Sequence, residues 1–254
     1  EHGMNADNTN RTFPCRIYLT DFSQLPDLTC RQLLEALPAS RRKRIQGLSH
    51  PAAIAQSVAV SALLYEALAK ADGSAEGACT IIPAARLTAD RLEPLTKRYP
   101  LDWTPSPSGQ PFPGGIAAGL GDRSSGLLYT SLSHSGVWAA AAIARCPVGL
   151  DIQSPDPLPD HRLLRIGARF HPQETAGLEQ LTPAERQSAF YRLWTMKESV
   201  MKLCGAGFSL PLRSFCISRE ASGTYTALLS DGRRAALWPQ KMEGLYLAAA
   251  FWNT

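Results

Sequence analysis

One segment in the C-terminal part of the chain carries residues that are well suited to chemistry. In FYRLWTMKESVMKLC, Glu198 and Lys202 are four positions apart, and Trp194 precedes Glu198 by another four. Residues at this spacing are neighbours on one helix face, and the segment contains no Gly or Pro. A carboxylate and an ammonium beside an aromatic ring form either a plain surface ion pair or a base with a phosphate clamp. The apolar residues that predict a buried stripe on this helix are Leu193, Met196, Val200 and Leu203.

A second polar pattern lies on a predicted strand, VGLDIQ, at 148–153. Side chains alternate between the two faces of a strand, so Asp151 and Gln153 share one face while Leu150 and Ile152 share the other. Two oxygen-bearing side chains on one face can share a cation. The alternative is a half-exposed edge strand with no ligand.

Two further groups of polar residues could bind phosphate. The segment Ser133–Gly136 is predicted to be a short polar turn between strands at 127–132 and 137–144, and free N–H groups in such a turn suit an anion. The basic run Arg41, Arg42, Lys43 and Arg44 is either a solvated helix face or a landing site for phosphate or an acidic protein.

The remaining pattern mixes helices with strands. Residues 73–126 are rich in Gly and Pro and are expected to form loops around one short helix. We predict helices at 29–37, 52–71, 89–97 and 162–170, one starting at Pro172, and strands at 16–22, 215–217, 225–229, 235–238 and 246–251.

Composition limits the class of protein. The 254 residues are 44% hydrophobic and 19% charged, which supplies a core and argues against disorder. The net charge of +4 favours an acidic or phosphorylated partner, but the basic run lacks the interleaved aromatic residues of a nucleic-acid binder. Six scattered cysteines without a CxxC pair suit a reducing cytoplasm. We expect no signal peptide, no apolar run long enough to span a bilayer and no membrane partner.

Separated motifs together resemble a known family. They are SLSHSG at 131–136, VGLDIQ at 148–153, RFHPQE at 169–174, LWTMKESVMK at 193–202 and GAGFSLPLRSF at 205–215, with a weaker GQP at 109–111. In order and spacing the chain resembles the 4'-phosphopantetheinyl transferases, specifically the larger, monomeric class that is similar to the surfactin-synthetase-activating enzymes. The resemblance covers roughly residues 15–251.

The resemblance implies a fold and an activity. It implies an α+β fold built as a pseudo-twofold pair of similar subdomains, each with a small, largely antiparallel sheet and helices, and an active site in the cleft between them. We expect a tag remnant and flexible tail at 1–14 and subdomains at 15–146 and 147–254. The implied reaction moves phosphopantetheine from coenzyme A to a serine of an apo acyl or peptidyl carrier protein and releases adenosine 3',5'-bisphosphate. The alternative is a non-catalytic module that binds coenzyme A or a nucleotide.

The resemblance also implies a metal site. Mg²⁺, or Mn²⁺ in its place, would be held by Asp151 and Glu198, because magnesium needs only one or two carboxylates besides phosphate oxygens and water. Glu198 is also the implied base, acting directly or through water, and Lys202 would pair with the pyrophosphate or the leaving oxygen. The family usually has an acid where this chain has Gln153, so we expect that amide to act through a water.

The coenzyme A contacts follow from the same resemblance. Ser133 and His134 would contact phosphate, and the loop Gly109, Gln110 and Pro111 would lie against the adenine. The 3'-phosphate would depend on Arg41, Arg42, Lys43 and Arg44 together with His134. Lys197 projects about 100° away from Glu198 around the helix, so it is either a phosphate contact or a structural ion pair. Glu174 matches an acid of the family and is expected to have a structural or supporting role, or else to be a carboxylate that the dipole favours at a helix start.

Overall fold

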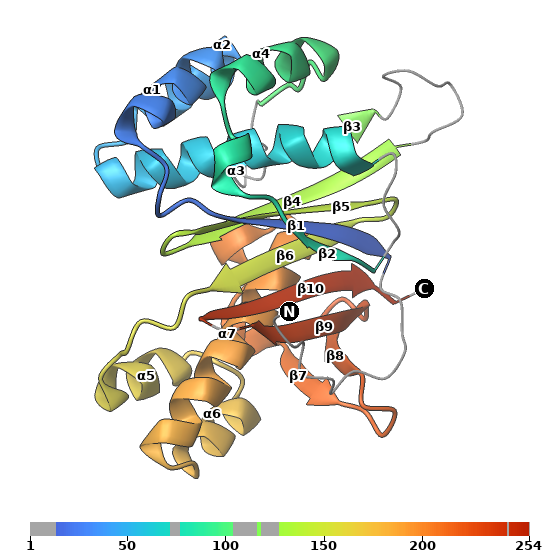
Figure 1. The fold of residues 1–254 in the computed structure, drawn as a ribbon. Coiled ribbons are helices and arrows are strands. Elements are labelled where there is room, and N and C mark those ends of the chain that lie inside the picture. The colour runs from blue at the N-terminus through green and yellow to red at the C-terminus, as the bar shows by residue number, and fades with distance from the viewer. Residues whose placement is uncertain (1–13, 72–76, 104–115, 118–126, 243, 254) are drawn as a thin grey trace.

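The computed structural model describes residues 14–71, 77–103, 116–117, 127–242 and 244–253, which form two stacked sheets with helices on both outer faces (Figure 1). The first sheet has the strand order β2-β1-β5-β4-β3. Its strands are β1 (Cys15–Asp21), β2 (Cys79–Ile81), β3 (Ile116–Ala117), β4 (Leu127–Ser135) and β5 (Trp138–Ala144). β1 and β2 are parallel, and the other pairs are antiparallel.

The second sheet comes from the C-terminal part of the chain and is antiparallel throughout, in the order β6-β10-β9-β8-β7. Its strands are β6 (Val148–Gln153), β7 (Cys216–Arg219), β8 (Tyr225–Leu228), β9 (Arg234–Met242) and β10 (Leu245–Trp252). The chain therefore passes from the first sheet to the second within residues 145–147. The division into subdomains at 146 agrees with this crossing and stays a prediction.

A long helix covers the outer face of each sheet. The helices are α1 (Asp27–Ala36), α2 (Ala39–Gln46), α3 (Pro51–Ala71), α4 (Ala89–Arg98), α5 (Asp160–Gly167), α6 (Pro172–Glu179) and α7 (Pro183–Cys204). α3 packs on β1, β4 and β5, whereas α7 packs on β6, β9 and β10. Figure 1 shows the resulting layers, with α1 to α4 on one side of the stacked sheets and α5 to α7 on the other. The predicted α+β fold with a pair of largely antiparallel sheets is confirmed.

The cores follow from the alternation of side chains along the strands. Between the sheets, Ile17 and Leu19 of β1 pack in one cluster with Leu150 and Ile152 of β6. On the far side of the second sheet, residues of α7, including the buried Val200, pack on β8 to β10. The predicted buried stripe of α7 is confirmed for Met196, Val200 and Leu203, which are at most 7% exposed, while Leu193 is half-buried.

α7 begins seven residues before the predicted start at Phe190. Thr182 accepts a hydrogen bond from the N–H of Glu185, the carboxylate of Glu185 bonds back to the N–H of Thr182, and Pro183 occupies the first turn. This capping box satisfies the free N–H groups at the helix start.

α3 contradicts one expectation. The span Pro51–Lys70, with a mean hydropathy of 1.5, is long and apolar enough to cross a membrane by length and composition, so the prediction that the chain lacks such a run is wrong. In the structure 61% of this window is buried. Its apolar surface packs against the first sheet and neighbouring helices, where Leu63, Leu64 and Tyr65 are fully buried.

Candidate functional site

Gly149 lets α7 lie directly on β6. A Cβ built at this position would be 1.9 Å from the carbonyl oxygen of Ser199 and 2.5 Å from the backbone nitrogen of Leu203. Only a residue without a side chain permits two backbones to approach so closely. The contact falls on the turn of α7 that carries Glu198 and Lys202, and Asp151 follows on the same face of β6. The predicted polar residues of strand and helix are thereby brought together.

Asp151 is buried, with 3% of its surface exposed, and three donors hold its carboxylate. Oδ1 accepts hydrogen bonds from Nζ of Lys202 at 2.9 Å and from Oγ of Ser133 at 2.9 Å. Oδ2 accepts from Nε2 of Gln153 at 3.1 Å. A buried charge is tolerated when it is paired and hydrogen-bonded. These three bonds therefore explain why the Asp151 carboxylate can be buried between a sheet and a helix.

Glu198 has the opposite character, because its charge is poorly satisfied. Its Oε1 is buried and has no hydrogen-bond partner in the part of the chain that the structure describes. Burial, and then the charge of Asp151, raise the pKa of Glu198 to about 7, against the opposing charge of Lys202. The two carboxylates are therefore close enough to repel, and Glu198 is poised to take up a proton near neutral pH.

This raised pKa predicts a pH-dependent stability. The carboxyl titrates near 4.5 when unperturbed and near 7 in the fold, so the folded protein holds the extra proton between these values. The stability that this proton contributes is fully present below pH 4.5 and is lost as the pH rises through 7. The melting temperature of the metal-free protein should therefore fall between pH 5 and pH 8 more steeply than that of Glu198→Gln. Equal slopes in thermal melts of the two proteins would contradict the assignment.

A row of serines joins the two sheets next to Asp151, and sequence reasoning missed it. The hydroxyl oxygens of β4 accept hydrogen bonds from outward N–H groups of β6 and the residue after it: Ser131 from Leu150 at 2.8 Å, Ser133 from Ile152 at 3.2 Å and Ser135 from Ser154 at 2.9 Å. Side chains thus replace a backbone ladder between β4 and β6. The alternation of serines in SLSHS was the available signal, since it places all three hydroxyls on one face.

The prediction of a polar turn at Ser133–Gly136 is wrong, because β4 continues through Ser135. The three residues pair in register with β5, Ser133 with Ala140, His134 with Ala139 and Ser135 with Trp138. Only Gly136, at φ 56°, adopts a left-handed turn conformation, and its carbonyl accepts a hydrogen bond from Gln56. The backbone N–H groups of this segment therefore belong to a strand and do not form a free phosphate nest.

The two predicted phosphate contacts in this segment differ in position. Ser133 is buried, and its hydroxyl donates to Asp151 and accepts from the N–H of Ile152. This role differs from the predicted phosphate contact. His134 keeps contact with solvent. Burial of its ring lowers the pKa of His134, and so do the charges of Lys202 and Arg41, against an opposing effect of Asp151. His134 is thus near the same charged groups and available to an anion.

Among the basic residues at 41–44, Arg41 is the one that points inward. Its Nε donates to Oγ of Ser61 at 2.9 Å, and its guanidinium lies 4.5 Å from the ring centroid of Trp103. Burial, and then the charge of Arg44, lowers the pKa of Arg41 to about 10, so it stays cationic at neutral pH. Arg42 instead pairs with Glu35 at 3.3 Å.

Lys43 and Arg44 of the same run are exposed to solvent. The run is therefore a largely solvated helix face from which a single cation, Arg41, turns inward to Ser61 and Trp103.

Lys197 has the structural role that the sequence left open. It is 0% exposed and pairs with Glu174 at 2.8 Å. Its ammonium also donates to the carbonyls of Leu212 and Phe215 and lies over the Phe215 ring at 4.2 Å. Glu174 in turn accepts from the N–H groups of His171 and Ile217, as expected of a structural acid. Lys197 therefore holds α7 to α6 and β7, and it is not placed to bind coenzyme A.

Two other predicted contact residues bind protein atoms in the structure. Lys202 was expected on a pyrophosphate, and in the structure its ammonium instead binds Asp151 and the carbonyl of Leu132. Gln153 was expected near the metal, and it donates to Asp151. Gly109, Gln110 and Pro111 lie outside the described residues.

The side chains near Asp151 offer few ligands for a metal ion. Within the described residues no group of three or more His, Cys, Asp and Glu side chains could hold one. Two carboxylates remain, Asp151 and Glu198, and the second has a buried oxygen without a partner. This set does not suit zinc, but it fits Mg²⁺, which takes one or two carboxylates and completes its shell with phosphate oxygens and water.

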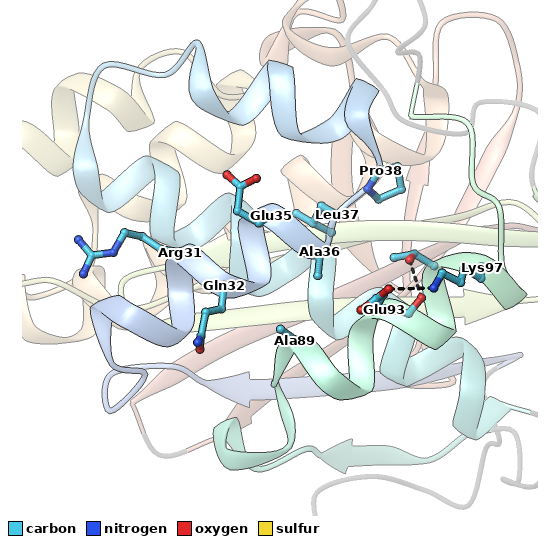
Figure 2. A pocket seen from close by; sticks show the side chains of 10 residues that line it. Arg31, Gln32, Glu35, Ala36, Leu37, Pro38, Ala89, Glu93 and Lys97 are labelled. Carbon is cyan, nitrogen blue, oxygen red and sulfur yellow. Dashed lines mark hydrogen bonds and ion pairs between the residues drawn. The ribbon is translucent and has the colours of Figure 1, made fainter.

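A separate pocket lies between α1 and α4, away from these residues (Figure 2). It is open, has a volume of about 710 Å³ and is lined by residues such as Glu35 and Pro38 on one side and Glu93 and Lys97 on the other. Glu93 and Lys97 pair with each other at 2.8 Å. None of the predicted site residues lines this pocket.

A comparison with known protein families finds a match in the C-terminal half of the chain. Residues 147–250 match the ACPS family, described as the 4'-phosphopantetheinyl transferase superfamily. A 4'-phosphopantetheinyl transferase of Bacillus subtilis is 37% identical over 106 residues, which are 41% of this chain and 46% of that protein. The enzyme psf-1 of Bacillus pumilus is 40% identical over 104 residues, 41% of this chain and 43% of the relative. The match thus spans less than half the length of each curated relative.

Solved structures give a weaker likeness. The holo-[acyl-carrier-protein] synthase of Neisseria meningitidis is 19% identical and covers 42% of this chain and 98% of its own, with a TM-score of 0.34, which is too low to support an argument. The family match includes both β6 with Asp151 and α7 with Glu198 and Lys202. Residues 147–250 of this chain are therefore similar to the 4'-phosphopantetheinyl transferase superfamily, and the chain has relatives among the Bacillus enzymes of that name.

Proposed function

We propose that this protein transfers the 4'-phosphopantetheine group from coenzyme A to a serine hydroxyl of an apo acyl or peptidyl carrier protein, with Mg²⁺, and releases adenosine 3',5'-bisphosphate. The main support is the convergence of Asp151 and Glu198. They come from a strand and a helix 47 positions apart in sequence, yet the charge of one raises the pKa of the other. Both lie in the part of the chain that matches the superfamily.

The protein residues divide the chemistry between them. Asp151 and Glu198 would hold the Mg²⁺, which, when bound, neutralises the pyrophosphate and stabilises the leaving phosphate. Glu198 accepts the proton of the attacking serine hydroxyl, directly or through a water, because a hydroxyl is a weak nucleophile until a base removes its proton. The serine oxygen then forms the new bond to the phosphorus that carries pantetheine, and the bond from that phosphorus to adenosine 3',5'-bisphosphate breaks.

Cations from both halves of the molecule would orient the anionic substrate. Arg41 and His134 come from the first half, and Lys202 comes from α7. The charges of Arg41 and Lys202 both lower the pKa of His134, which places the three groups in one electrostatic neighbourhood. We assign Arg41, rather than its exposed neighbours Lys43 and Arg44, to the 3'-phosphate of coenzyme A. Holding a phosphate between fixed cations contributes to catalysis by positioning and by charge neutralisation.

The proposal also includes the cellular location, the oligomeric state and the partner. We propose a cytoplasmic protein that acts as a monomer, since both sheets of the pseudo-twofold fold come from one chain and the six cysteines are free thiols. The partner would be an acidic carrier domain, which suits a chain of net charge +4.

Mass spectrometry of apo carrier proteins tests the reaction. Fatty-acid, polyketide and nonribosomal-peptide carriers would each be incubated with the protein, coenzyme A and Mg²⁺. At least one carrier should gain the mass of one phosphopantetheinyl group on its serine, and chelation of the metal should prevent the gain. Coenzyme A binding with no carrier modified would overturn the transferase proposal and leave a non-catalytic binding module.

A further inference from the structure

The side chain of Gln153 has a defined orientation next to Asp151. One of its terminal atoms lies 3.1 Å from Oδ2 of Asp151, and the other lies 3.5 Å from Oγ of Ser135. An ionised carboxylate can only accept hydrogen bonds, so the atom that faces Asp151 is the amide nitrogen. The amide oxygen therefore faces Ser135 and points away from the carboxylate.

Hydrogen bonds on both edges of the strand fix the backbone at Gln153, and this supports the orientation of its side chain. Gln153 pairs in register with Tyr246 of β10. On the opposite edge, the N–H of the next residue, Ser154, donates to Oγ of Ser135 at 2.9 Å. The same serine therefore fixes the end of β6 and contacts the amide oxygen, which couples the position of the strand to the rotation of the amide.

The three donors around Asp151 leave about one lone-pair position of its carboxylate for a cation. A carboxylate has about four lone-pair positions, and Lys202, Ser133 and Gln153 occupy three of them. The donors fall on both oxygens, so the carboxylate plane is fixed. A glutamate at position 153 would bring a second acceptor beside Asp151 and would repel it, so the amide supplies something that an acid at this position cannot.

We propose that Gln153 is a positioning residue that fixes the Asp151 carboxylate through a donated hydrogen bond, and that its amide is not a ligand of the metal. Among the described residues, Asp151 and Glu198 alone would then be ligands of the cation. This replaces the expectation that Gln153 reaches the metal through a water. The statement about the metal rests on the proposed function, whereas the hydrogen bond to Asp151 does not.

The first experiment tests the hydrogen bond in metal-free protein. In nuclear magnetic resonance spectra of the full chain labelled with ¹⁵N, a proton of the Gln153 side-chain amide should resonate downfield of the other glutamine amides, because its acceptor is charged. Asp151→Ala should return the signal to the ordinary range. An ordinary shift in the unaltered protein would overturn the proposal.

The second experiment adds Mg²⁺ to the same sample. If the amide is a donor, its downfield signal should persist while backbone signals near Asp151 and Glu198 move. Coordination through the amide oxygen would require the amide to turn, so loss of the downfield signal on metal binding would overturn the proposal. If no signal near Asp151 and Glu198 moves, the proposed metal site fails, and the first experiment still decides the contact.

The third experiment separates positioning from a merely structural role. Gln153→Met keeps the length of the side chain and removes the donor. We expect kcat to fall about tenfold with KM for coenzyme A unchanged, because partners that orient a metal ligand typically contribute this much. Gln240→Met on β9 is the matched control, being half-buried in the same sheet, and should leave kcat unchanged.

Two outcomes of the kinetic experiment are distinct. A wild-type kcat in Gln153→Met overturns the positioning role. Failure of the unaltered protein to modify any carrier overturns the proposed function, and the two spectroscopic experiments then still decide how Gln153 contacts Asp151.

Discussion

Glu198→Gln is expected to lower the turnover of carrier modification by about 10³-fold, the largest effect on catalysis in a folded protein that we predict. The substitution keeps the size of the side chain and removes both the negative charge and the ability to accept a proton. Glu198 is the member of the carboxylate pair whose buried oxygen has no partner among the described residues. This oxygen of Glu198 therefore makes no hydrogen bond that stabilises the fold and is available to a bound group.

The same substitution should leave the folded protein intact. A neutral amide does not repel Asp151. The substitution also removes a carboxylate whose pKa burial and Asp151 raise to about 7, against the opposing charge of Lys202. We expect the variant to be at least as stable as the unaltered protein at pH 8 and to bind coenzyme A with an affinity within about threefold of it. A loss of kcat without a loss of binding separates catalysis from recognition.

Steady-state kinetics with coenzyme A, Mg²⁺ and an apo carrier measure the effect, and calorimetry measures the binding. Glu179→Gln on α6 is the control, because it removes the same charge from an exposed position. It should change kcat by less than about twofold. A turnover of Glu198→Gln near that of this control would remove Glu198 from the role of base.

Gly149→Ala is expected to destabilise the protein by about 4 kcal/mol or to prevent folding, the largest structural effect that we predict. The added Cβ would lie 1.9 Å from the carbonyl oxygen of Ser199 and 2.5 Å from the backbone nitrogen of Leu203. Both are backbone atoms of a helix interior, so no side-chain rotation can relieve the contact. α7 would have to move away from β6 by well over an ångström.

Such a movement would also affect the site. Glu198 and Lys202 lie on the turn that contacts Gly149, and Asp151 bonds Lys202 at 2.9 Å. Any folded Gly149→Ala protein should therefore have lost this ion pair and most of its turnover. Close-packed interiors rarely absorb a displacement of this size without losing contacts elsewhere.

A glycine on a neighbouring helix provides the matched control. Gly177 lies within α6, and a Cβ at that position would meet nothing within 4 Å. Gly177→Ala should be neutral or stabilising by up to about 1 kcal/mol, because alanine favours the helix over the unfolded chain. Chemical denaturation of both variants measures the difference. A Gly149→Ala protein as stable as Gly177→Ala would refute the close approach of α7 and β6.

Patterns that are local in sequence were sufficient to predict most helices and strands. α3, α4 and β6 lie within a residue or two of their predicted ends because periodicity and flanking prolines are local signals. The segment at Ser133–Ser135 shows where such reasoning fails. Its short polar residues favour a turn, but pairing with β5 and bonds from β6 hold it as a strand. Tertiary contacts outweighed the local preference.

The roles of the lysines in α7 illustrate the same limit. Spacing shows that Lys197 and Lys202 point in different directions around the helix, but it cannot say which direction faces the site. Packing placed Phe170 and Phe215 around Lys197, so its charge is enclosed and pairs with Glu174. Lys202 reached Asp151 because Gly149 let the helix approach β6.

What the sequence by itself determined was the set of chemical groups, the elements that carry them and, through the motifs from 131 to 215, the family to which they are similar. Only the tertiary structure decided which groups meet. It turned one arginine of the basic run inward and placed Ser133 and Gln153 in hydrogen bonds to Asp151. It also left Oε1 of Glu198 without a hydrogen-bond partner among the described residues. The physical reason is that burial and hydrogen bonding depend on contacts between segments far apart in the chain, which no local pattern contains.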